Sequence, residues 1–134
     1  MKELDELDLP EDLRYAENHE WAKSEADNLR IGISDYAQDQ LGDMVFVELP
    51  RVGDTFAQKE QFGTVESVKA VSELYMPVAG EIISVNKTLE ESPELVNKDP
   101  YGKGWMIEVK PSDLSELETM MTKGVYMEML RGKK

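Results

Sequence analysis

Short segments in which apolar and polar residues alternate are the feature that most constrains the fold of this chain. The alternation runs through residues 29–33, 45–49 and 105–109. Because the side chains of an extended strand point alternately to the two faces of a sheet, each segment predicts a strand with one buried face. The positions expected to face the core are Leu29, Ile31, Ile33, Val45, Val47, Leu49, Trp105, Ile107 and Val109, with Met106, Glu108 and Lys110 facing the other way. Turn signals at Pro50 and across residues 97–104 separate these strands, which predicts a mainly β fold whose two hairpin-rich halves close a small barrel-like sandwich.

Helical signals are confined to a few places. Ser34 is positioned to cap a short helix, and Gly42 is positioned to end it. Ser112 is positioned to cap an amphipathic helix that runs up to Gly124 and packs on the sheet. The apolar positions of this helix are Leu114, Leu117, Met120 and Met121. We expect residues 125–130 to continue as a second short helix near the C-terminus.

A length of 134 residues fits one compact domain with a hydrophobic core of its own. We expect residues 1–12 to form an N-terminal extension, either loose or containing a short helix that Pro10 stops, and residues 13–134 to form a single domain that includes the C-terminal helix. The first residues are acidic, unlike a secretory signal, and no apolar run is long enough to span a bilayer. The expected location is therefore cytoplasmic.

The charge of the chain bears on its partners. Twenty-eight acidic against 15 basic side chains give a formal net charge of −13. Electrostatic repulsion then disfavours nucleic acid and anionic membranes as partners. Proteins with basic faces are favoured, although an acidic surface that only maintains solubility fits the composition equally well.

Several kinds of chemistry are excluded or disfavoured by residue type. The chain has no cysteine, so it has no disulfide, no thiolate metal ligand and no thiol nucleophile of its own. His19 is the only histidine, which rules out a histidine-rich metal site and favours a packing role. No segment has the ligand spacing of an EF-hand loop. We therefore expect no metal site.

Lys69 lies between two runs that have the composition of strands, residues 62–68 and 77–85. This arrangement predicts a hairpin with Lys69 at its tip. A loop on a rigid scaffold presents its side chains to an outside enzyme, so a modifying enzyme could reach this lysine. The spacing alone favours an ordinary solvated lysine, because lysines are mostly exposed.

Five motifs follow one another along the chain. They are His19-Glu20-Trp21, residues 31–43, residues 45–50, residues 66–81 around Lys69, and Pro100-Tyr101-Gly102 followed by residues 104–107. In this order they resemble the H-protein family of the glycine cleavage system, the small lipoyl-lysine carriers. The resemblance extends from about Leu13 to the C-terminal region.

The resemblance implies a fold, a cofactor and a role. The fold is the barrel-sandwich hybrid, or hammerhead, of lipoyl and biotinyl carriers, with short helices and a C-terminal helix. Lys69 would be the attachment site of covalently bound lipoate, since amidation removes the lysine charge and adds a long flexible arm. The tethered group would then be concentrated at whichever enzyme docks. The protein itself would be a non-catalytic carrier in glycine catabolism and one-carbon metabolism, and we expect a monomer.

The same resemblance implies the partners. The carrier would accept an aminomethyl group from the pyridoxal-phosphate glycine decarboxylase (P protein) and pass it to the tetrahydrofolate-dependent aminomethyltransferase (T protein). Dihydrolipoamide dehydrogenase (L protein) would reoxidise the dithiol that remains. A lipoate ligase or lipoyl transferase would attach the arm.

A cleft for the loaded arm is also implied, at positions that match Asn18, Glu20 and Glu73. Because the loaded group is prone to hydrolysis and its amine is cationic, such a cleft needs acceptors or a carboxylate. Glu20 follows His19 as in the family motif. Glu73 replaces the usual aspartate and reaches one methylene further, Asn18 stands where some members have serine, and Met76 is bulkier than the residues common there. A solvated surface carboxylate remains the alternative interpretation, above all for Glu73.

Other functions are weighed against this one. A biotin carrier has methionine on both sides of its lysine, whereas Val68 and Ala70 flank Lys69. A Schiff-base enzyme that uses pyridoxal phosphate needs a phosphate-binding glycine-rich loop and a buried lysine, and the sequence indicates neither. The closest alternative is an H-protein-like lipoyl carrier that acts in lipoyl relay or sulfur oxidation.

Overall fold

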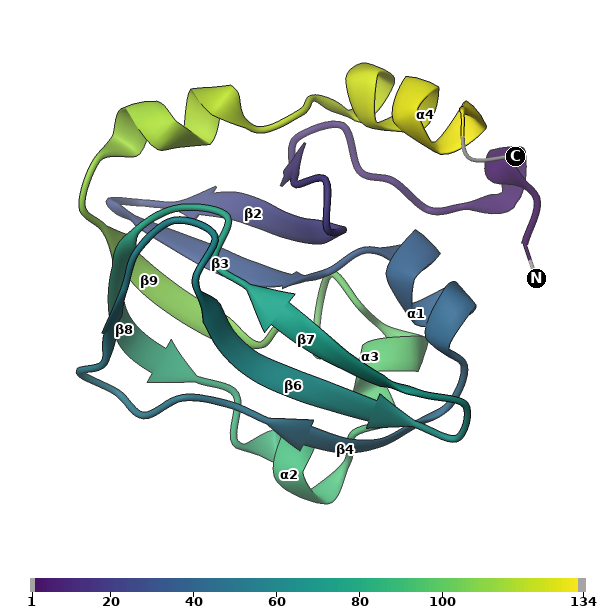
Figure 1. The fold of residues 1–134 in the computed structure, drawn as a ribbon, viewed down its shortest axis with the longest axis horizontal. Helices are drawn as coiled ribbons and strands as arrows, with labels where there is room; N and C mark the ends of the chain where they lie inside the picture. Colours follow the sequence, from purple (N-terminus) through teal and green to yellow (C-terminus); the bar gives the residue numbers. More distant parts are fainter. Residues whose placement is uncertain (1, 133–134) are drawn as a thin grey trace.

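The computed structural model describes residues 2–132 and shows two antiparallel sheets (Figure 1). The six-stranded sheet has the order β1-β2-β3-β9-β8-β5, and the three-stranded sheet has the order β4-β6-β7. The strands are β1 (Arg14–Tyr15), β2 (Glu20–Glu25), β3 (Asn28–Ile33), β4 (Met44–Glu48), β5 (Thr55–Phe56), β6 (Gln61–Ser67), β7 (Val71–Tyr75), β8 (Gly80–Val85) and β9 (Ile107–Pro111). The predicted mainly β fold of two facing sheets is confirmed.

Short helices connect the strands and cover their ends. They are η1 (Leu4–Glu6), α1 (Asp35–Leu41), α2 (Thr88–Glu91), α3 (Leu95–Lys98), η2 (Leu114–Thr119) and α4 (Lys123–Arg131). The predicted cap of α1 is confirmed, because the Ser34 hydroxyl accepts a hydrogen bond from the Ala37 N–H and Gly42 ends the helix with a φ of 82°. Within residues 2–132, no helix is both long enough and apolar enough to cross a bilayer.

The predicted helix from Ser112 to Gly124 is wrong in its extent and its cap. Asp113 caps a 3₁₀ helix that ends at Thr119. Met121 cannot continue that helix, because it exchanges two backbone hydrogen bonds of 2.8 Å with Tyr15. A new helix, α4, then starts after Thr122, which confirms the second short helix expected at residues 125–130.

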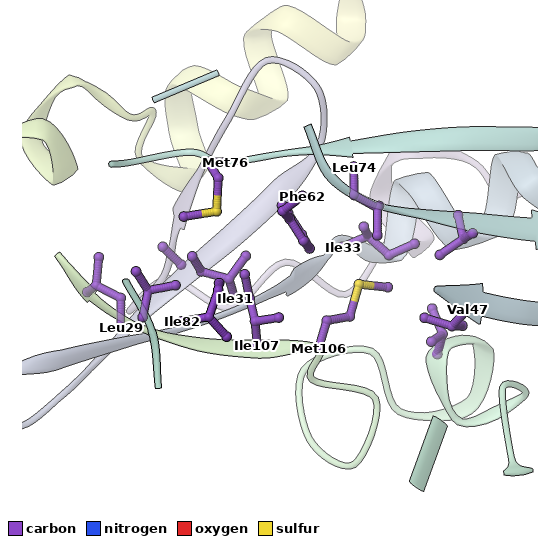
Figure 2. Close-up of a cluster of buried hydrophobic side chains, with 14 of the residues drawn as sticks. Leu29, Ile31, Ile33, Val47, Phe62, Leu74, Met76, Ile82, Met106 and Ile107 are labelled. Carbon is purple, nitrogen blue, oxygen red and sulfur yellow. The ribbon is translucent and has the colours of Figure 1, made fainter. Parts of the chain in front are cut away.

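The main core fills the space between the two sheets (Figure 2). Of the predicted inward positions, Leu29, Ile31, Ile33, Val47, Ile107 and Val109 are buried. Val45 is instead 50% exposed, because an irregularity in register between Met44 and Phe46 shifts the alternation, and Met44 is buried in its place. Met106, predicted to face outward, is fully buried, because it lies before the start of β9 and the alternation of that strand does not yet apply to it.

A second apolar cluster joins the two ends of the chain. Its buried members are Leu9, Leu13, Tyr15, Trp21, Tyr126 and Leu130. The rings of Tyr15 and Tyr126 are stacked with centroids 4.6 Å apart. Figure 1 shows the N-terminal segment, which contains η1, beside α4. The segment before residue 13 contains the short helix η1, one of the two forms expected for it.

Gly63 marks a place where two strands approach too closely for a side chain. A Cβ atom at this position would overlap the backbone carbonyl of Glu48 on β4. We expect Gly63→Ala to lower the free energy of unfolding by about 2–4 kcal/mol, because backbone has to move. Urea unfolding measures this. Gly124→Ala on α4 is the control, since nothing lies within 4 Å of the added Cβ, and a stability slightly above wild type is expected there. Equal stabilities of the two variants would contradict the close approach.

Candidate functional site

Lys69 lies in the turn between β6 and β7, and its side chain is exposed. The predicted hairpin tip is therefore correct, but the predicted partner strand is wrong. Residues 77–85 were expected to pair with the first strand, whereas β7 does so and β8 belongs to the other sheet. The sequence pattern of β7 is weak because only one of its five residues, Leu74, is buried.

Ser67 fixes the backbone of this turn. Its hydroxyl oxygen accepts hydrogen bonds from the N–H groups of Lys69 and Ala70, both at 3.1 Å, and its own N–H donates to the Ala70 carbonyl at 2.8 Å. The Val68 N–H donates to the carbonyl of Asp43 at 3.0 Å, which joins the turn to the loop after α1. The backbone under Lys69 is thus held in place while its side chain remains accessible.

Gly42 leaves space for the aliphatic part of Lys69. A Cβ atom at residue 42 would lie 3.2 Å from Lys69 Cε, and the positive φ of Gly42 also disfavours any side chain there. Asn97 holds this loop from α3. Its side-chain amide donates to the Gly42 carbonyl at 2.9 Å, and its amide oxygen accepts from the Met44 N–H at 2.9 Å. The lysine therefore extends over a fixed, smooth segment at the end of α1.

A cavity of about 250 Å³ lies next to this segment. Its lining residues are Asn18, His19, Glu20, Ile33, Tyr36, Ala37, Gln40, Leu41, Ser72, Glu73 and Leu74. Gln40 and Leu41 directly precede the Gly42 loop, and Ser72 and Glu73 follow the Lys69 turn. The cavity is thus bounded by both segments that meet at Lys69. The structure brings together all three predicted cleft residues, with Asn18 and Glu73 exposed at the cavity and Glu20 buried in its wall.

Glu20 is 2% exposed and is the acid whose protonation is most affected by its surroundings. Burial raises the pKa of Glu20 to about 8, and the Tyr75 N–H, which donates to Glu20 Oε2 at 3.2 Å, opposes that shift. Glu20 also lines a second cavity, of about 430 Å³, on whose wall Met120 and Met121 lie. A cation placed beside Glu20 would favour its carboxylate form and so strengthen their attraction.

His19 shapes the chain between Asn18 and Glu20. Its φ of 77° lies in the left-handed region, which is uncommon for a residue with a side chain. The ring is held by a 2.8 Å hydrogen bond between Nδ1 and the Tyr126 hydroxyl and lies 4.7 Å from the ring of Tyr36. The packing role expected for His19 is confirmed by these contacts.

Some lining residues were not predicted. On α1, Tyr36 and Gln40 are four residues apart, as are Ala37 and Leu41, so their helical spacing was a usable signal once α1 was known to border the site. Asn97 had no local signal, because its partners are more than 50 residues away in sequence. Over residues 2–132 no three acidic or histidine side chains are grouped so that they could hold a metal ion.

Comparison with known proteins gives a consistent result. The family described as Glycine cleavage H-protein matches residues 13–133. A Glycine cleavage system H protein of Bacillus licheniformis is 58% identical over 125 residues, which cover 93% of this chain and 98% of that protein. One of Bacteroides thetaiotaomicron is 50% identical over 126 residues, covering 94% and 100%. The crystal structure of a glycine cleavage system H protein from Mycobacterium marinum matches with a TM-score of 0.83 at 37% identity, over 90% of this chain and 98% of that one. The chain therefore belongs to the glycine cleavage H-protein family.

Proposed function

We propose that this chain is the lipoyl-carrying shuttle of the glycine cleavage system. It accepts an aminomethyl group from the pyridoxal-phosphate glycine decarboxylase and passes it to the tetrahydrofolate-dependent aminomethyltransferase. Dihydrolipoamide dehydrogenase then reoxidises the carrier, which catalyses no step itself. Family membership supports the role, and the observation that carries it is the exposed Lys69 on a fixed turn beside a cavity with a buried carboxyl group.

Lys69 is the proposed attachment site, joined through its Nζ to lipoate by an amide bond. The lipoyl group supplies a dithiolane whose sulfur takes up the aminomethyl group. The surroundings of Lys69 fit such an arm, because the turn is fixed by Ser67 and the absence of a side chain at Gly42 leaves room along the lysine stem. A lipoate ligase or lipoyl transferase is the proposed modifying enzyme.

The cavity is the proposed resting place of the loaded end of the arm. Glu20 and Glu73 offer carboxyl oxygens to a cationic amine, and Asn18 offers a side-chain amide. Tyr36 and Leu41 supply an apolar wall that limits access of water. In this proposal Glu20 gives up its proton when the amine arrives, since the positive charge offsets the effect of burial.

The proposed domain organisation follows the site. Residues from 13 onward form one carrier domain and residues 1–12 an N-terminal extension, of which residues 2–12 pack on the domain. The contacts that support this are two hydrogen bonds to Asp35 at the start of α1. They come from Lys2 Nζ at 2.8 Å and from the Asp8 N–H at 2.9 Å.

The function is tested by following the intact mass of the protein through two reactions. Incubation with a lipoate ligase, ATP and lipoate is expected to add a single lipoyl increment. Glycine and the pyridoxal-phosphate decarboxylase are then expected to add an aminomethyl increment, which tetrahydrofolate and the aminomethyltransferase remove. Lipoylation without aminomethyl loading, with both enzymes active on a control carrier, would favour lipoyl relay or sulfur oxidation instead.

Removal of a cavity carboxylate is expected to shorten the lifetime of the loaded group. Glu20→Gln and Glu73→Gln should each speed hydrolytic loss several-fold without blocking lipoylation, because the cationic amine loses a charged partner. The decay of the loaded mass after removal of the enzymes measures this rate. Glu81→Gln changes an exposed carboxylate on β8 that does not line the cavity and should decay like wild type. Unchanged decay in both cavity variants would contradict the proposed resting place.

A further inference from the structure

An exposed apolar patch lies beside Lys69 on the outer face of the three-stranded sheet. It consists of Val45, Phe46, Val68 and Val71, which are 50%, 52%, 67% and 66% exposed. None of these four side chains lines the cavity that borders the turn. We call this set the hairpin patch. Its residues are large and apolar, so leaving them in water is unfavourable unless a partner covers them.

The strand register places Phe46 and Val71 on the same face of the sheet. Phe46 on β4 lies opposite Glu66 on β6, which lies opposite Val71 on β7. Directly opposed residues of antiparallel strands share a face of the sheet, so these three form one outward row. In the neighbouring row, Val47 and Val65 are buried and Ser72 lines the cavity. Val68 lies two residues after Glu66, in the turn that carries Lys69, and Val45 directly precedes Phe46.

Acidic side chains lie within and beside the hairpin patch. Glu66 is exposed between Phe46 and Val71, and Asp43 and Glu48 are exposed beside the patch. Among the ion pairs of residues 2–132 none involves these three acids. The complementary surface on a partner would combine apolar side chains with basic ones that meet these acids.

We propose that the hairpin patch is the docking surface for the enzyme that forms the amide bond on Lys69. This rests on the proposed function. The Lys69 nitrogen ends a short stem of four methylene groups, so an enzyme that activates lipoate must approach the residues next to Lys69 to place its reactive carbonyl at that nitrogen. The enzymes that act later work at the far end of a much longer arm and do not need these contacts. Amidation transfers the lipoyl acyl group from lipoyl-adenylate, made from ATP and lipoate, to the lysine nitrogen, with release of AMP and a proton.

The experiment measures kcat/KM of a lipoate ligase with the full-length unmodified chain as substrate. The double variant Phe46→Ser/Val71→Ser is expected to lower kcat/KM by about tenfold or more, because apolar side chains at an interface centre carry much of the binding energy. Val52→Ser/Val125→Ser is the matched control, since these residues are 61% and 55% exposed and lie outside the patch. The control should stay within about twofold of wild type. Increasing salt should lower the wild-type kcat/KM, as expected where the acidic side chains within and beside the patch meet basic ones on the enzyme.

The outcomes separate this inference from the proposed function. A wild-type chain that gains no lipoyl group overturns the proposed function. A wild-type chain that is modified while the patch variant reacts equally fast overturns the docking surface alone. Val68→Ser, a change in the turn rather than in a strand, tests the same surface if the double variant unfolds. After prolonged modification, lipoylated patch variants should load and transfer the aminomethyl group at wild-type rates, and an equal loss in those steps would overturn the assignment to the attaching enzyme.

Discussion

Lys69→Arg is expected to abolish lipoylation while leaving the fold intact. Arginine keeps the positive charge, but its guanidinium does not form the amide that lipoate requires. The turn does not depend on the lysine side chain, because Ser67 and the carbonyl of Asp43 hold its backbone. Incubation with a lipoate ligase, ATP and lipoate should therefore leave the intact mass of the variant unchanged. Without the arm, the variant should also show no aminomethyl loading from glycine.

The control for this prediction is Lys110→Arg, which changes an exposed lysine on β9 in the other sheet. It should gain one lipoyl group at the wild-type rate. Thermal unfolding of both variants should match wild type, because exposed substitutions change stability by about 0.5 kcal/mol or less. A lipoyl increment on Lys69→Arg, located by peptide sequencing on another lysine, would show that Lys69 is not the site.

The exposure of Lys69 also bears on the rival functions. A lysine that forms a Schiff base with pyridoxal phosphate is activated by desolvation or by a neighbouring cation. Lys69 is instead exposed at a hairpin tip, where a separate enzyme can reach it. A biotinyl domain shares this placement of its lysine, so the flanking Val68 and Ala70, rather than the fold, favour lipoate over biotin.

Strands were predictable where one of their faces is buried and the alternation of apolar and polar residues is not interrupted. β3 and β9 have such patterns, and their buried residues were identified correctly apart from the ends. β4 was only partly predicted, because the irregularity after Met44 changes the face of Val45, and a register shift depends on the partner strand. β7 was missed as the partner of β6, because a strand with a single buried residue leaves almost no hydrophobic pattern.

The candidate site shows the same limit. Lys69 at the hairpin tip, the cavity acids and the α1 cap could all be named from short motifs. The burial of Glu20 could not, because its surroundings come from distant segments, such as the Tyr75 N–H that donates to it from 55 positions later in the sequence. The hydrogen bonds of Asn97 to the Gly42 loop were invisible for the same reason. Local sequence thus indicates which residue types lie near the site. Their protonation, and the hydrogen bonds that hold the site in place, depend on contacts between distant segments.

Glu20→Gln is expected to stabilise the protein in alkaline solution. The ordinary pKa of the side chain is 4.5, and burial raises it to about 8 in the folded protein. The folded state therefore keeps a proton that the unfolded chain releases, and the free energy of unfolding falls as the pH rises between these two values. Above about pH 8 the buried charge lowers stability by a few kcal/mol, since each unit of pKa shift corresponds to about 1.4 kcal/mol. Glutamine has no charge to bury and still offers an oxygen to the Tyr75 N–H.

Urea unfolding at about pH 5 and about pH 9 tests this, with the expected gain of the variant over wild type near zero at the lower pH and a few kcal/mol at the higher one. Glu81→Gln removes an exposed carboxylate, so its difference in unfolding free energy from wild type should be the same at the two pH values. A Glu20→Gln curve parallel to wild type would mean that Glu20 titrates near its ordinary pKa. Together with faster loss of the loaded group, a stabilised Glu20→Gln would show that this acid is kept for its function against its effect on stability, as is common for buried charges at functional sites.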